Sequence, residues 1–246
     1  MIEIVDLNAA YDKKPVLWNV SCLLPEGQMI GVIGPNGAGK STLIKIIVGL
    51  IEPLSGSVKI KGSKNKIAYV GQRNEVDWDF PITVYEVALM GLIGKLGLWK
   101  RPTRQDRKKV METLDQLGIL PYAHRQIGEL SGGQQRRLFV ARALLQEADI
   151  YLLDEPFAAI DITTERLLFD IFTALTKEGK TVVVVHHDLT QIKAYFSYLV
   201  MLNIHLVAAG PTETVFHYDN FSKTFGDQVS ILEEALKLTD SKKQGV

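Results

Sequence analysis

The sequence predicts an α/β fold with a mixed sheet core, an N-terminal antiparallel β layer and an inserted α-helical lobe. Three observations lead to this expectation. The apolar run Met29–Ile33 precedes a glycine-rich loop, after which apolar residues have the spacing of a helix, at Leu43, Ile44, Ile46, Ile47 and Leu50. Residues 1–33 otherwise consist of short strand-like segments separated by turns. From about Asn74 to Glu147, apolar residues instead recur at helical intervals.

The glycine-rich loop matches the phosphate-binding pattern G-x-x-x-x-G-K-[ST]. Its residues are Gly34, Pro35, Asn36, Gly37, Ala38, Gly39, Lys40, Ser41 and Thr42. Glycines let successive backbone N–H groups surround an anion, and the helix that starts near Lys40 directs its positive dipole end at the same place. Lys40 would reach the β- and γ-phosphates of a nucleotide, and the Ser41 hydroxyl would bind Mg²⁺. A glycine turn without a ligand is the alternative, which the flanking strand and helix disfavour.

Composition limits the classes of partner. The 246 residues carry 28 basic and 28 acidic side chains, so no net charge would attract nucleic acid or acidic lipid. Cys22 is the single cysteine, so no intrachain disulfide can form, and residues 1–6 do not resemble a signal peptide. No apolar run approaches the roughly 20 residues of a membrane span. We expect one large cytosolic domain that meets partners through a local surface.

Further strands lie on either side of the loop. Ile2–Val5 and Val16–Leu24 are strand-like, and Tyr11 between them is an aromatic residue beside a turn, for which surface packing is the ordinary explanation. Lys66–Val70 is a later strand that is followed by Gln72. Because α/β sheets bind ligands beyond the carboxyl ends of their strands, Gln72 is a candidate site residue. Alternatively, it is a loop glutamine that contacts the backbone.

The helical stretch contains two features of interest. Lys95–Lys109 is rich in Lys and Arg, and we expect a solvated helix face rather than contact with lipid headgroups or a membrane partner. Ser131 and Gln134 have capping-box spacing, which predicts a helix start. Gly132 and Gly133 would let another molecule approach the exposed N–H groups, which makes this helix start a candidate second anion site. A capped helix without a ligand remains the alternative.

Two adjacent carboxylates end the next apolar run. Asp154 and Glu155 follow Ile150–Leu153, and Pro156 helps to end the strand. Successive side chains on a strand point in opposite directions, so one carboxylate can bind Mg²⁺ while the other orients and deprotonates a water. Solvated loop acids are the alternative, which the apolar run and the upstream phosphate loop disfavour.

The remaining pattern continues the alternation of helix and strand. A helix is expected at about Thr164–Thr176, and the β-branched run Thr181–Val185 is typical of a parallel strand covered on both faces. His186 and His187 follow at the ligand edge of the sheet. A zinc site there is disfavoured, because adjacent histidines on an extended chain diverge and no Cys or His at zinc spacing accompanies them.

The C-terminal part is expected to be supporting structure. Leu199–Leu202 and His205–Ala208 predict a hairpin, and the residues from Gly210 predict a capped short helix. A terminal amphipathic helix is expected at Ser230–Leu238, followed by a frayed tail.

Together these motifs resemble, in order and spacing, the ATP-binding subunits of ABC transporters. The residues that carry the resemblance are Tyr11, Gly34–Thr42, Gln72, Leu130–Gln134, Ile150–Glu155, Asp161 and His187. A phosphate loop combined with L-S-G-G-Q just before an apolar strand ending in D-E is specific to that family, and the resemblance covers the whole chain. It implies the P-loop NTPase (RecA-like) fold and an ATPase that uses ATP and Mg²⁺.

The resemblance also implies roles for the site residues. Tyr11 would stack on adenine, and the loop with Lys40 would hold the phosphates. The implied Mg²⁺ ligands are Ser41, Gln72 and Asp154. The implied catalytic residues are Glu155 as general base, His187 as the contact to the γ-phosphate, and Gln72. Ser131, Gly132, Gly133 and Gln134 would act on ATP held by the opposite subunit of a homodimer, with Asp161 at the interface.

The segment Gln72–Val84 narrows the resemblance further. Its V-D-W-D-F-P stretch is similar to ATP-binding subunits of bacterial manganese and zinc importers, which work with a membrane permease and an extracytoplasmic metal-binding protein. This implies a peripheral protein at the cytoplasmic face of the membrane that powers import of a divalent metal, manganese before zinc. Asp77 and Asp79 could form a cation site, although a structural or permease-docking role is favoured.

The resemblance implies a single ABC ATPase domain over residues 1–246. Its expected parts are a nucleotide-binding core at 1–73 and 148–225, a helical lobe at 74–147, and a C-terminal helix and tail at 226–246. One rival is an importer ATPase for another substrate. A soluble ABC ATPase is disfavoured because the chain has one cassette, no coiled-coil or zinc insertion and no basic face for nucleic acid. Glu155 and His187 argue against a binding module without ATPase activity.

Overall fold

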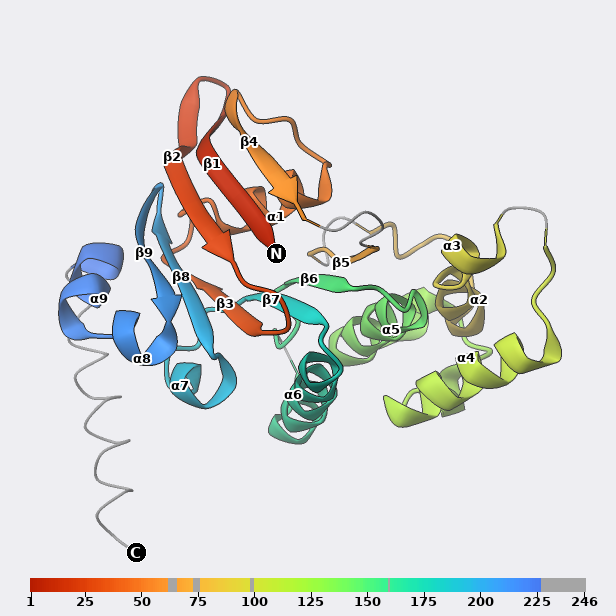
Figure 1. The fold of residues 1–246 in the computed structure, drawn as a ribbon. Helices are drawn as coiled ribbons and strands as arrows, with labels where there is room; N and C mark the ends of the chain where they lie inside the picture. Colours follow the sequence, from red (N-terminus) through yellow and green to blue (C-terminus); the bar gives the residue numbers. More distant parts are fainter. Residues whose placement is uncertain (62–65, 73–75, 98–99, 159, 227–246) are drawn as a thin grey trace, which may run out of the picture.

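The computed structural model describes residues 1–61, 66–72, 76–97, 100–158 and 160–226, and Figure 1 shows their arrangement. The strands are β1 Ile2–Tyr11, β2 Lys14–Leu24, β3 Met29–Ile33, β4 Ser55–Ile60, β5 Ile67–Val70, β6 Ile150–Asp154, β7 Thr181–Val185, β8 Tyr198–Asn203 and β9 His205–Pro211. The α-helices are α1 Lys40–Val48, α2 Val84–Met90, α3 Ile93–Leu96, α4 Arg104–Gln116, α5 Gly132–Leu145, α6 Ile162–Lys177, α7 Ile192–Tyr195, α8 Thr212–Val215 and α9 Tyr218–Phe225. Two short 3₁₀ helices are η2 Leu120–Tyr122 and η3 Ile127–Glu129.

The larger sheet has six strands in the order β5-β6-β7-β3-β8-β9. The first five strands run parallel, and β9 is antiparallel to β8, which confirms the predicted mixed sheet core. In this register Asp154 pairs with Val185, and Val32 pairs with Val185 from the other side. The carboxyl ends of β6, β7 and β3 therefore lie next to one another at one edge of the sheet.

A smaller antiparallel sheet, ordered β2-β1-β4, confirms the predicted N-terminal β layer. The first strand is longer than expected: β1 continues to Tyr11, which the sequence places beside a turn between strands. The reason is the tight turn formed by Asp12 and Lys13, whose φ angles of 46° and 67° suit the two-residue hairpins that keep strands paired to their ends. Tyr11 is thus the last residue of a strand and is 47% exposed.

Both faces of the larger sheet are covered, as the β-branched run of β7 predicts. Val182 and Val184 belong to one apolar cluster, with residues of α5, α6 and the helical lobe. Val183 and Val185 belong to a second cluster, with residues of α1 and the smaller sheet. The alternation of side chains along one strand therefore divides the core into two layers.

Helix α1 begins at Lys40, as predicted, and contacts both β2 and β6. Leu50 was expected on its apolar face but lies beyond the C-terminal cap. Gly49, with a φ of 85°, ends the helix in a left-handed conformation, and Leu50 is 61% exposed. Helical spacing alone did not reveal this cap.

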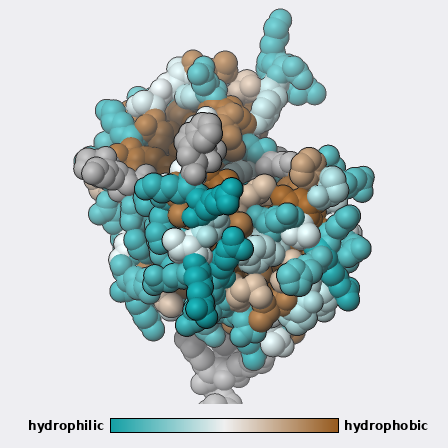
Figure 2. Space-filling model, turned by 90° about the vertical axis from the view of Figure 1, so that its right-hand side faces the viewer, coloured by the Kyte–Doolittle hydropathy of each residue, from teal (hydrophilic) through white to brown (hydrophobic). Residues whose placement is uncertain are grey.

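The inserted lobe consists of α2 to α5 and lies beside β5 and β6 in Figure 1. Three of its helices start with reciprocal capping boxes, formed by Thr83 with Glu86, Thr103 with Asp106, and Ser131 with Gln134. The side of the molecule turned to the viewer in Figure 2 is mostly hydrophilic, with separate hydrophobic patches. The described Lys and Arg side chains of Lys95–Lys109 are mostly exposed.

The C-terminal elements differ from expectation in one detail. Strands β8 and β9 form the predicted hairpin, but α8 follows Pro211 without a side-chain cap. The Thr212 hydroxyl donates instead to the carbonyl of Phe196, at 2.6 Å. The helix predicted at Ser230–Leu238 lies outside the described residues. In the described ranges, every helix is too short or too polar to span a bilayer.

Candidate functional site

The edge of the larger sheet collects four of the predicted site segments. The phosphate loop follows β3, Gln72 follows β5, Glu155 follows β6, and His187 follows β7. Since these strands are parallel neighbours, the segments meet at the carboxyl ends, where open α/β sheets bind ligands.

Lys40 is the buried cation of this edge and is only 6% exposed. Its ammonium group donates hydrogen bonds to the carbonyls of Gly34, at 2.9 Å, and Pro35, at 2.8 Å. Burial lowers the pKa of Lys40, and the negative charges of Glu155 and Asp154 oppose that shift. The charge of Lys40 therefore interacts both with the carbonyls of the phosphate loop and with the carboxylates of Asp154 and Glu155.

Gly39 gives the loop its shape at the start of α1. Its φ of 89° is left-handed, and a Cβ atom there would lie 2.3 Å from the carbonyl oxygen of Val16 in β2. Only glycine fits this close approach without strain. No side chain in the described part of the chain caps α1, so its first N–H groups face the loop, as in an anion-binding helix start.

Ser41 and Gln72 are brought together although 31 residues separate them. The Gln72 amide nitrogen donates to the Ser41 hydroxyl oxygen at 3.0 Å. Asp154, which ends β6, is fully buried beside the same edge. Hydroxyl, amide and carboxylate oxygens are the donors that Mg²⁺ prefers, so the residues present suit that ion.

Asp154 and Glu155 have different environments, but the cause is not the predicted alternation of side chains along a strand. Strand β6 ends at Asp154, and Glu155 has a left-handed φ of 53°. The Glu155 N–H donates to the carbonyl of Val185 at 3.2 Å. A sharp backbone turn, and not strand alternation, therefore separates the buried carboxylate from the half-buried one.

The two histidines after β7 have opposite environments. His186 is 3% exposed, and its ring packs against Phe157 and Phe196, each at 5.5 Å between ring centroids. Burial lowers the pKa of His186 to about 4. His187 is exposed, so it is the histidine that a ligand can reach. Sequence reasoning missed the buried role of His186, which the aromatic residues at 195 and 196 could have suggested.

The L-S-G-G-Q motif forms the predicted helix start. The Ser131 N–H donates to the Gln134 side-chain oxygen at 2.9 Å, and the Gln134 N–H donates to the Ser131 hydroxyl at 3.3 Å. Among the described residues, no hydrogen bond joins Ser131–Gln134 to the loop 34–42. Within one chain, this candidate second anion site is therefore not joined by hydrogen bonds to the phosphate loop.

Asp161 caps helix α6. It accepts hydrogen bonds from the Thr164 N–H, at 2.9 Å, and from the Thr164 hydroxyl, at 2.7 Å. These hydrogen bonds lower the pKa of Asp161. Within one chain, the role of Asp161 is therefore that of a helix cap.

Among the described residues, Asp77 and Asp79 belong to no candidate metal site. In the part of the chain that the structure describes, no group of three or more His, Cys, Asp or Glu could hold a metal ion.

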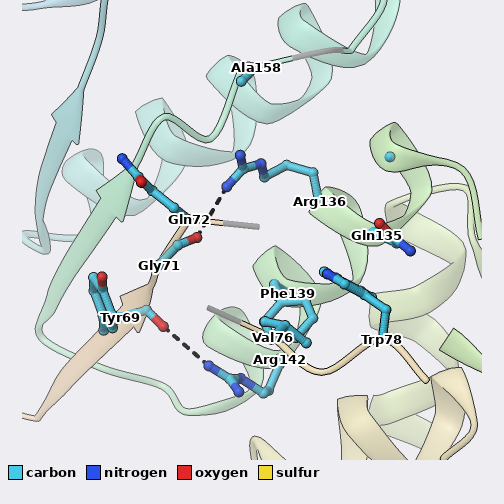
Figure 3. A pocket seen from close by; sticks show the side chains of 11 residues that line it. Tyr69, Gly71, Gln72, Val76, Trp78, Gln135, Arg136, Phe139, Arg142 and Ala158 are labelled. Atoms are coloured by element: carbon cyan, nitrogen blue, oxygen red, sulfur yellow. Dashed lines mark hydrogen bonds between the residues drawn. The ribbon is translucent and has the colours of Figure 1, made fainter. Parts of the chain in front are cut away.

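A cavity of about 390 Å³ lies between the sheet edge and the helical lobe (Figure 3). Its lining residues are Tyr69, Gly71, Gln72, Val76, Trp78, Gly132, Gln135, Arg136, Phe139, Arg142 and Ala158. The rings of Trp78 and Phe139 meet edge to face at 5.5 Å. Sequence reasoning singled out the 76–81 segment and Gln72, but it did not place them in one cavity.

A glycine-rich loop between a parallel strand and a helix, with a buried lysine bound to the loop carbonyls and two carboxylates at the same sheet edge, defines a P-loop nucleoside triphosphatase. The family model described as ABC transporter matches residues 17–158. The chain therefore belongs to the ABC transporter family and is an ATPase of that family.

Similar proteins agree with this assignment. The chain is 48% identical over 238 residues to the manganese transport system ATP-binding protein MntB of Bacillus subtilis (strain 168), covering 95% of each chain. It is 44% identical over 234 residues to the zinc transport system ATP-binding protein TroB of Treponema pallidum (strain Nichols), covering 93% of this chain and 88% of that one. The dimeric post-hydrolysis structure of the ATP-binding cassette MJ0796 with ADP and Pi matches with a TM-score of 0.76 and 27% identity, covering 86% of this chain and 98% of that chain.

The environment of Gly39 generates a prediction about the loop. Gly39→Ala should weaken ATP binding by about tenfold or more, because the added methyl group meets the Val16 carbonyl and the loop must shift. Fluorescent-nucleotide titration measures the effect. Gly49→Ala is the matched control, since Gly49 has a φ of 85° but open space around its Cβ position. It should lower stability by about 1 kcal/mol and leave ATP affinity unchanged; equal losses of affinity would contradict the steric explanation.

Proposed function

We propose that this chain is the ATP-hydrolysing subunit of a bacterial importer of divalent metal, manganese first and zinc next. The ATPase site is supported above all by the buried Lys40, whose ammonium group donates to two carbonyls of the phosphate loop and whose charge interacts with those of Asp154 and Glu155. The metal assignment is supported by the names of the two relatives, which are ATP-binding proteins of a manganese and a zinc transport system. The imported metal would pass through the permease and not through this subunit.

In the proposed site, the chain holds the nucleotide by its phosphates. Lys40 and the N–H groups of the loop would bind the β- and γ-phosphates, and Tyr11 would stack on adenine. Ser41, Gln72 and Asp154 would hold Mg²⁺, which when bound neutralises part of the triphosphate charge.

Hydrolysis would be assisted by Glu155 and His187, the two accessible side chains that follow β6 and β7 at the sheet edge. The half-buried Glu155 would orient the attacking water and accept its proton. The exposed His187 would contact the γ-phosphate from the neighbouring strand. Gln72 is hydrogen-bonded to Ser41 and also lines the cavity beside the helical lobe. It would therefore connect the Mg²⁺ ligands to the lobe.

Two copies of the chain would complete each site. The start of α5 is capped by its own residues, and Gly132 and Gly133 leave its N–H groups open to a close approach. In a homodimer, Ser131, Gly132 and Gly133 would bind the ATP held by the partner, with Asp161 at the interface. ATP would then favour the closed dimer over the open one. If ATP bound the closed dimer more tightly by about 5.5 kcal/mol, the population would shift almost completely from open to closed. Hydrolysis would reopen the pair.

The cavity beside the lobe would receive the permease. Its walls include Val76, Trp78 and Phe139, so an apolar segment of a membrane subunit could bury side chains there. The V-D-W-D-F-P segment would then serve in docking, and the protein would be peripheral at the cytoplasmic face of the membrane. An extracytoplasmic metal-binding protein would act only through the permease.

Glu155→Gln tests the general base. It should preserve ATP binding and lower turnover by roughly 10²-fold to 10⁴-fold, the usual contribution of a general base. Phosphate release and nucleotide binding are measured in parallel. Glu178→Gln, at the exposed end of α6, is the control that should keep normal turnover. Near-normal turnover in Glu155→Gln would remove that residue from the role.

Ser131→Arg tests the shared site. The large cation would occupy the mouth of α5, so ATP-driven dimers should be lost while each monomer still binds nucleotide. Size-exclusion chromatography with ATP, in the Glu155→Gln background that slows hydrolysis, measures the dimer. A dimer that survives this substitution would refute the proposal that Ser131 faces the partner's nucleotide.

The transported substrate is tested in cells. Deletion of this protein should abolish accumulation of one divalent metal, manganese before zinc, because the permease loses its energy source. Elemental analysis of cells measures the metals, and a Glu155→Gln copy is the control that should fail to restore uptake. Unchanged metal content together with the loss of a different nutrient would assign the importer to another substrate.

A further inference from the structure

We propose that Arg136 is a positioning residue whose single guanidinium group fixes the two peptide bonds that lead into Gln72 and Glu155. Arg136 lies on α5, two residues after the L-S-G-G-Q motif. The inference rests on the proposed roles of Gln72 and Glu155, and it adds a residue of the helical lobe that acts through them.

The contacts of Arg136 connect the lobe to two neighbouring strands. Its Nη1 atom donates to the carbonyl oxygen of Gly71 and to that of Asp154, both at 3.2 Å. Figure 3 shows the side chain extending from α5 toward Gly71 beside the cavity. Gly71 directly follows β5, and Asp154 is the last residue of β6. One side chain of the lobe thus holds the ends of two parallel strands of the sheet.

Each carbonyl shares a peptide plane with the next N–H group. The Gly71 carbonyl is coplanar with the N–H of Gln72, and the Asp154 carbonyl is coplanar with the N–H of Glu155. The Glu155 N–H donates to the Val185 carbonyl at 3.2 Å. This second plane is therefore held at both ends, by Arg136 on one side and by β7 on the other.

Holding that plane constrains the backbone of Glu155. Its φ of 53° is unfavourable for a residue with a side chain and persists only where the surroundings impose it. A guanidinium group suits this task, because it stays charged and its planar N–H donors form charge-assisted hydrogen bonds. Any displacement of α5 would move both peptide planes together, and with them the amide of Gln72 and the carboxylate of Glu155.

The experiment compares two adjacent arginines in the full-length chain. Arg136→Met removes the donors and keeps most of the aliphatic length. Arg137→Met is the matched control, because the Arg137 Nη1 atom donates to the Leu117 carbonyl within the lobe, at 3.1 Å. The measurements are kcat, KM for ATP, ATP affinity in EDTA and the thermal unfolding midpoint.

Arg136→Met should lower kcat by about tenfold, which corresponds to ~1.36 kcal/mol on the barrier. KM for ATP and the affinity in EDTA should stay within about twofold, since the phosphate loop is not touched. Arg136→Lys, which keeps a charged donor, should recover part of the loss. Arg137→Met should keep kcat within about twofold of the unmodified chain even if its unfolding midpoint falls.

Several outcomes would overturn the inference. They are a normal kcat in Arg136→Met, an equal loss in Arg137→Met, a parallel loss of ATP affinity, or no recovery in Arg136→Lys. If Arg136→Met does not fold, the same criteria apply to Arg136→Gln, whose shorter side chain cannot reach both carbonyls. The proposed role of Glu155 fails separately, when Glu155→Gln itself retains turnover.

Discussion

The parallel pairing of β6, β7 and β3 is the constraint on which the rest of the structure depends. Asp154 and Val32 both pair with Val185, so the three strands end at the same level. The phosphate loop, Glu155 and His187 then leave the sheet side by side. The two apolar layers that cover the sheet keep this edge fixed. Lys40 can be buried there because its ammonium group donates to loop carbonyls and the negative charges of Asp154 and Glu155 favour its charged form.

Local patterns carried much of the fold and of the candidate site. The loop at 34–42, the capping box of Ser131 and the β-branched strand Thr181–Val185 are encoded within a few residues, and the structure has each where the sequence predicts it. The positions of Gln72 and Glu155 at strand ends follow from the same local reading. Their assigned roles stay predictions.

Other features depend on contacts between distant segments, which periodicity cannot supply. The hydrogen bond between Gln72 and Ser41 requires β5 and β3 to be placed in one sheet. The burial of His186 depends on rings from 157 and 196. Leu50 was misplaced because a left-handed glycine ended the helix, and the bonds of Arg136 became visible only in three dimensions.

The reciprocal caps of α2, α4 and α5 have a mechanical consequence. Each helix start is satisfied by a side chain three residues away, so none of these caps depends on the sheet. A movement of the lobe relative to the sheet would therefore leave these three helix starts capped. Such a movement would have to break the hydrogen bonds from Arg136 to Gly71 and Asp154 and the one from Arg142 to the Tyr69 carbonyl. These few arginine contacts would therefore hold the lobe against the sheet.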